Sequence, residues 1–100
     1  MPLPKEPPLS GVYMGKDCVL TKLYTQHLMY VSTDDLIVGP HLINLGFTEP
    51  HNTRILTSLI QPGDVFVDIG ANIGYFSVLG GWRSYPGGSQ WAFEPQPALY

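Results

Sequence analysis

The chain has 100 residues, a length common for one small domain, and 44% of them are hydrophobic, as in an ordinary globular core. Only 13% are charged, about half the usual share, so the chain either buries much of its surface or is covered by further protein. The formal net charge of −3 and the scattering of the five Lys and Arg residues exclude a basic patch that neutralises phosphates. We therefore expect no nucleic-acid partner.

Composition also argues against disulfides, metals and membranes. A single cysteine, Cys18, allows no intramolecular disulfide and no cysteine-based metal site. His27, His41 and His51 lack paired ligand spacing, so no metal is predicted. No apolar run approaches the roughly 18 residues of a membrane span, and the N-terminus has no apolar signal segment. We expect a soluble, cytoplasmic protein.

The first part of the chain is predicted to be a tail followed by strands. Residues 1–10 contain four prolines, which predicts a disordered or extended tail ahead of a domain over residues 11–100. Residues 18–24 and 27–31 are rich in β-branched and aromatic side chains and are separated by a short polar break. This pattern predicts a hairpin or a small meander.

A turn and a helix should follow. The short apolar run Leu36–Val38 comes after an acidic turn, and Gly39-Pro40 is expected to end it. A helix is predicted over about residues 49–60, with Thr48 as N-cap and Pro50 in its first turn. An apolar stripe at helical spacing supports this helix: Ile55, Leu56, Leu59 and Ile60.

The last third of the chain reads as a β-α-β unit. Val65–Ile69 is a nearly continuous apolar run, typical of a strand buried on both faces of a parallel sheet. A helix over Ile73–Leu79, a return loop beginning at Gly80-Gly81 and a second short buried strand over Trp91–Glu94 complete the unit. The fold class is therefore α/β, with a β-hairpin-rich part ahead of a helix and a parallel sheet.

Acidic side chains stand at the carboxyl end of both predicted parallel strands, which is the edge where open α/β sheets bind ligands. Gly70 keeps the backbone open to a ligand, and Gly74 is expected to let the helix start close to the sheet. Amides near Asn72 can receive a ligand carboxylate, and Glu94 is placed to accept two ribose hydroxyls. The predicted cofactor-binding residues are Asp68, Gly70, Ala71, Asn72, Gly74 and Glu94.

The glycine loop distinguishes two classes of cofactor. Dinucleotide binders use G-x-G-x-x-G, in which the middle glycine lets a pyrophosphate touch the backbone. Asn72 occupies that middle position here, which disfavours a pyrophosphate. The carboxylate of Asp68 instead favours a ligand that carries an ammonium and a sulfonium. S-adenosylmethionine has this character and also offers a ribose to Glu94.

Residues 63–77, GDVFVDIGANIGYFS, and residues 92–97, AFEPQP, resemble the FkbM family of S-adenosylmethionine-dependent methyltransferases. The resemblance implies a Rossmann-like methyltransferase fold and O-methylation of a sugar or a secondary-metabolite hydroxyl, on a small-molecule or glycan acceptor. It also implies that Asp68, Gly70 and Gly74 shape the cofactor pocket.

The domain of that family is considerably longer than this chain. We therefore expect residues 11–100 to be the N-terminal part of a truncated methyltransferase domain. The catalytic base should lie outside these residues, and this fragment alone should be inactive.

Two other functions stay open at this stage. One is a non-catalytic fragment or interaction module that retains the fold without a complete pocket. The other, which the missing middle glycine makes less favourable, is half of an NAD-type oxidoreductase.

Overall fold

The computed structural model describes Leu3 and residues 11–97, and the rest of the tail predicted over residues 1–10 lies outside the described residues. The chain divides into two compact units, Met1–Pro50 and His51–Tyr100. Among the described residues, no helix combines the length and the apolar character needed to cross a membrane.

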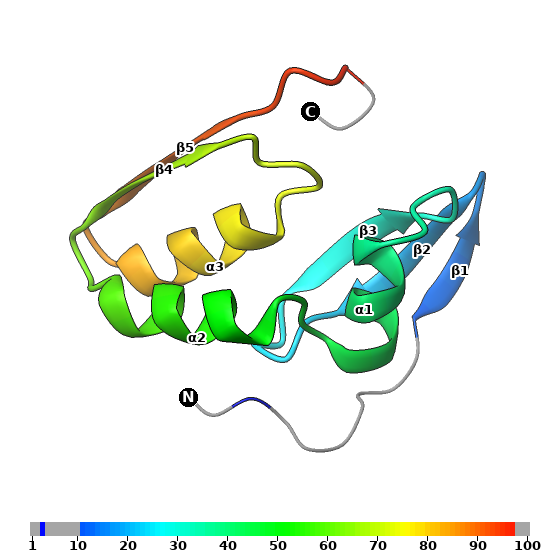
Figure 1. Ribbon diagram of the computed structural model, residues 1–100, viewed down its shortest axis with the longest axis horizontal. Coiled ribbons are helices and arrows are strands. Elements are labelled where there is room, and N and C mark those ends of the chain that lie inside the picture. The colour runs from blue at the N-terminus through cyan, green and yellow to red at the C-terminus, as the bar shows by residue number, and fades with distance from the viewer. Residues whose placement is uncertain (1–2, 4–10, 98–100) are drawn as a thin grey trace. The chain divides into compact units, whose positions relative to one another are not determined.

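Over its described residues, the first unit contains a three-stranded antiparallel sheet and one helix (Figure 1). The strands β1 (Val12–Gly15), β2 (Cys18–Lys22) and β3 (Leu28–Ser32) follow one another in space in chain order. Of the two arrangements predicted, a hairpin or a small meander, the structure therefore shows the meander. Helix α1 (Val38–Leu45) comes next in the chain and packs on β2.

Alternating burial explains why the first sheet forms where it does. In β3, Met29 and Val31 are buried while the residues between and beside them are exposed. Thr21 lies opposite Met29 in the register of β2 and β3, and its hydroxyl donates to the carbonyl oxygen of Leu42 in α1 at 3.4 Å. Leu42 is completely buried, so one face of the sheet and one side of α1 form the core of this unit.

Helix α1 corrects the prediction that Gly39-Pro40 ends a short apolar run. The helix begins at Val38, so both residues lie in its first turn. Asp35 explains the start, because its Oδ1 accepts hydrogen bonds from the amides of Ile37 and Val38, each at 3.0 Å. The first turn of a helix has amides without helical acceptors, and a proline there loses no helical hydrogen bond.

The second unit consists of α2 (Pro50–Leu59), β4 (Val65–Ile69), α3 (Tyr75–Ser84) and β5 (Ser89–Phe93). Strands β4 and β5 pair in parallel, from Val65 opposite Ser89 to Ile69 opposite Phe93, and α3 is the connection between them. The predicted β-α-β unit and the preceding helix are confirmed. Figure 1 shows α2 and α3 on the same side of the β4–β5 sheet.

The expectation that both strands are buried on two faces is wrong. A parallel sheet needs cover on each face, and the two helices of this unit lie on one side only. The face turned away from them carries large apolar side chains that expose more than half of their surface: Val65 at 68%, Val67 at 51%, Ile69 at 83%, Trp91 at 60% and Phe93 at 55%.

Helix α3 is longer than expected, because it continues through Gly80 and Gly81 to Ser84. These two glycines serve close packing instead of ending the helix. A Cβ atom at Gly80 would lie 2.2 Å from Cδ1 of the Phe66 ring, and one at Gly81 would lie 3.1 Å from Oε1 of Gln90. The missing side chains therefore let α3 approach the sheet.

We predict that Gly80→Ala destabilises the second unit and that Gly81→Ala does not. Alanine gains about 1 kcal/mol of helix propensity over glycine at either position. At residue 80 the rigid Phe66 ring must move, and overpacking of this kind costs about 1–3 kcal/mol. At residue 81 the neighbour is the flexible end of Gln90, which can shift. Urea unfolding followed by circular dichroism measures both changes, and equal effects of the two substitutions would contradict the packing argument.

Candidate functional site

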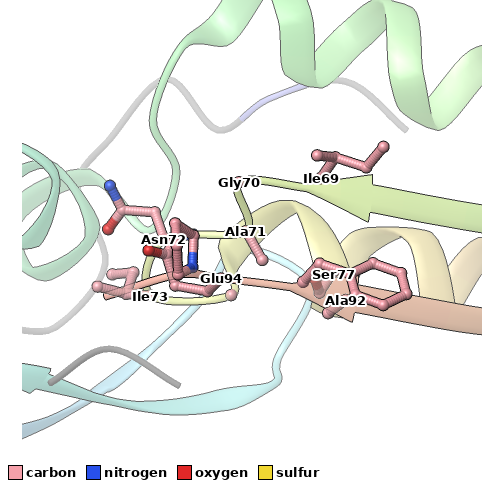
Figure 2. A pocket seen from close by; sticks show the side chains of 11 residues that line it. Ile69, Gly70, Ala71, Asn72, Ile73, Ser77, Ala92 and Glu94 are labelled. Carbon is pink, nitrogen blue, oxygen red and sulfur yellow. The ribbon is translucent and has the colours of Figure 1, made fainter. Parts of the chain in front are cut away.

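A cavity of about 520 Å³ lies at the carboxyl ends of β4 and β5 (Figure 2). Five of the six predicted site residues are among those that line it. The lining residues are Ile69, Gly70, Ala71, Asn72, Ile73, Gly74, Ser77, Ala92, Phe93, Glu94 and Pro95. The volume falls within the range of about 300–1,000 Å³ that is common for small-molecule sites.

Three residues of the loop from β4 to α3 have left-handed backbone conformations. The φ angles are +76° at Gly70, +56° at Asn72 and +94° at Gly74. Glycine adopts such angles without strain, and asparagine tolerates them better than most residues. A Cβ atom at Gly74 would meet nothing within 4 Å, so the expectation that Gly74 lets the helix start close to the sheet is wrong. The close approach of α3 to the sheet is instead at Gly80, in the middle of the helix.

Most amides of this loop already donate hydrogen bonds within the protein. Four of the five N–H groups of residues 70–74 have such acceptors. The bonds are Gly70 N to Phe93 O at 2.8 Å, Ala71 N to Phe93 O at 2.9 Å, Asn72 N to Glu94 Oε1 at 2.7 Å and Gly74 N to Ala71 O at 3.0 Å. Three of these bonds tie the loop to residues 93 and 94 at the end of β5, and the four together leave few loop amides for a phosphate.

Glu94 is held by both of its carboxylate oxygens. Oε1 accepts from the amide of Asn72 at 2.7 Å, and Oε2 accepts from the amide of Gln96 at 2.9 Å. The Asn72 amide, which we expected to receive a ligand carboxylate, therefore already receives that of Glu94. An ionised carboxylate has about four acceptor positions, so two remain for further donors. The bonds orient Glu94 at the cavity without exhausting its capacity to accept.

The cavity has an electrostatic character that selects among ligands. Glu94 is the one ionisable side chain among its described lining residues, and no Lys, Arg or His is among them. A negative charge beside apolar walls attracts cations and hydroxyl donors and repels anions. The site therefore suits a ligand with hydroxyl groups and positive charge.

Asp68 lies outside this lining, on the side of β4 that faces the helices. Its Oδ2 accepts a hydrogen bond of 2.7 Å from the hydroxyl of Ser77, which does line the cavity. Asp68 itself lines a second, mainly apolar cavity of about 470 Å³, together with residues of α2, Phe66 and Phe76. The predicted residue is thus connected to the site through Ser77.

Ser77 was not predicted, although the sequence contains a signal for it. Residues at spacings of three and four share one side of a helix. Along α3, Ser77, Gly80, Gly81 and Ser84 follow this spacing and are all small. A line of small residues in an otherwise apolar helix indicates the side that approaches the sheet, and Ser77 is its member nearest the loop.

Other residues considered from the sequence are not part of the site. Cys18 is half-buried in β2. His27 forms a hydrogen bond with Thr25, and His41 forms one with Thr48. Within the part of the chain that the structure describes, no three His, Cys, Asp or Glu side chains are grouped to hold a metal ion.

Comparisons with protein families, with curated proteins and with solved structures find no match for this chain.

We predict that Glu94→Ala loosens the loop locally. The amides of Asn72 and Gln96 lose their carboxylate acceptors, so their hydrogen exchange should accelerate at least several-fold. The amide of Ala71 is the internal control, because it donates to a backbone carbonyl that the substitution leaves in place. Unchanged exchange at Asn72 and Gln96, measured by NMR, would show that Glu94 does not hold the loop.

Proposed function

We propose that the second unit is the cofactor-binding part of an S-adenosylmethionine-dependent methyltransferase that modifies a hydroxyl group of a sugar or a secondary metabolite. The observation that carries the proposal is the placement of Glu94. Its carboxylate is oriented by two backbone amides at the rim of a cavity that has no cationic lining residue among those described.

The residues present fit this cofactor part by part. The two remaining acceptor positions of Glu94 suit the two hydroxyls of a ribose. The negative charge of Glu94, with that of Asp68 behind Ser77, favours a sulfonium and an ammonium. Ile69 and Phe93 supply apolar surface for a base.

When bound, S-adenosylmethionine supplies a methyl group attached to a positively charged sulfur. The residues of this unit contribute by holding that group in one orientation, and correct orientation accounts for a large part of the rate of such displacements. Glu94 and the left-handed loop that ends at Gly74 define the orientation. Glu94 and this loop bind and orient the cofactor, and neither transfers a proton in the proposed reaction.

The geometry gives two reasons to disfavour a dinucleotide. A pyrophosphate is held by free backbone amides and neutralising charges, whereas four of the five amides of residues 70–74 are already bonded. The lining also offers a carboxylate and no cation. Asn72 at the middle loop position agrees with both points.

We predict that the chain binds S-adenosylmethionine and that Glu94→Ala and Asp68→Ala weaken this binding. Loss of the two ribose hydrogen bonds to a charged acceptor should reduce affinity by at least about tenfold for Glu94→Ala. Asp68→Ala should have a smaller effect, because Asp68 acts through Ser77. Isothermal titration calorimetry measures the dissociation constant of each variant for S-adenosylmethionine.

Asp34→Ala is the matched control, since it removes one negative charge from a residue of the first unit that does not line the cavity. Its affinity for S-adenosylmethionine should equal that of the unaltered chain. Absence of binding by a folded chain, or equal affinities for all variants, would disprove the site assignment. Competition by NADH without competition by S-adenosylhomocysteine would favour the oxidoreductase alternative.

A further inference from the structure

Ser77 occupies a particular position between the cavity and a charged side chain. It is 7% exposed, lines the 520 Å³ cavity and lies in the first turn of α3. Its hydroxyl donates to Oδ2 of Asp68 at 2.7 Å, a length typical of a strong, charge-assisted hydrogen bond. Asp68 is the penultimate residue of β4, so this bond joins the end of the strand to the start of the helix.

The chemistry of a serine hydroxyl limits what it can then offer to a ligand. A hydroxyl has one proton to donate and two lone pairs to accept with. The single proton of Ser77 is directed to Asp68, which as a carboxylate can only accept. Toward the cavity the oxygen can therefore act only as an acceptor, and the neighbouring negative charge makes it a better one.

We propose that the hydroxyl oxygen of Ser77 accepts a hydrogen bond from the ammonium group of the ligand. Asp68 is the positioning residue, because it takes the single hydroxyl proton of Ser77 and leaves the oxygen free to accept. This inference rests on the proposed function, since it names the residue that recognises the amino-acid part of the same cofactor. It separates two tasks within one cavity: Glu94 binds the ribose hydroxyls, and Ser77 binds the ammonium. Figure 2 shows Ser77 set apart from the loop residues grouped with Glu94.

Three ligands test this division of roles. All three carry the sulfonium: S-adenosylmethionine adds an ammonium and a carboxylate, decarboxylated S-adenosylmethionine adds the ammonium alone, and 5′-deoxy-5′-dimethylsulfonioadenosine adds neither. In calorimetry with the full chain, Ser77→Ala should weaken the binding of the first two ligands equally, by roughly tenfold. It should leave the affinity for 5′-deoxy-5′-dimethylsulfonioadenosine within about twofold of the unaltered chain. Ser77→Thr keeps the hydroxyl and should restore most of the loss.

Ser84→Ala is the matched control, because Ser84 is also a buried serine of α3 and its hydroxyl bonds to the carbonyl of Gly81 outside the cavity. It should change none of the three affinities. Asp68→Asn provides an independent variant should Ser77→Ala fail to fold, and it should weaken binding of the two ammonium ligands more than binding of the third.

The outcomes separate this inference from the function on which it rests. If Ser77→Ala or Asp68→Asn weakens all three ligands equally, or none of them, the ammonium role is wrong while the cofactor assignment stands. If the unaltered, folded chain binds none of the three ligands, the proposed function itself is wrong and the inference falls with it.

Discussion

Helix α3 lies so close to strand β4 that one methyl group at residue 80 would overlap the ring of Phe66. Protein interiors are packed too densely to absorb such an overlap without movement elsewhere. The approach at Gly80 therefore sets the spacing between the helix and the sheet along its whole length. The first turn of the same helix carries Ser77, whose 2.7 Å bond to Asp68 depends on that spacing. The packing in the middle of the unit thus determines the geometry at its ligand-binding edge.

The edge itself is organised by backbone amides, which donate to a carbonyl oxygen and to a carboxylate of adjacent residues. The carbonyl oxygen of Phe93 accepts hydrogen bonds from two loop amides, and the carboxylate of Glu94 accepts hydrogen bonds from two further amides. These bonds hold the end of β5 against the loop that follows β4. A loop fixed in this way loses little conformational entropy when a ligand arrives, which leaves more of the contact energy for affinity.

The sequence predicted the local elements well and the tertiary consequences less well. The parallel strands and the antiparallel pair β2–β3 follow from local composition, and Gly70, Asn72 and Gly74 adopt the turn conformations that their residue types allow. Exposure of one sheet face could not be predicted, because it depends on where both helices pack. The role of Gly80-Gly81 could not be predicted for the same reason. A glycine that ends a helix and one that allows close packing are the same in the sequence, and only the position of Phe66 distinguishes them.

The division into two units has a practical spectroscopic consequence. The chain has two tryptophans, and both lie in the second unit: Trp82 half-buried in α3, and Trp91 exposed on β5. Tryptophan emission therefore follows the second unit alone, whereas far-ultraviolet circular dichroism records the helices and strands of both. Coincident unfolding transitions in the two signals would mean that the two units unfold together, and different transitions would mean that they unfold separately.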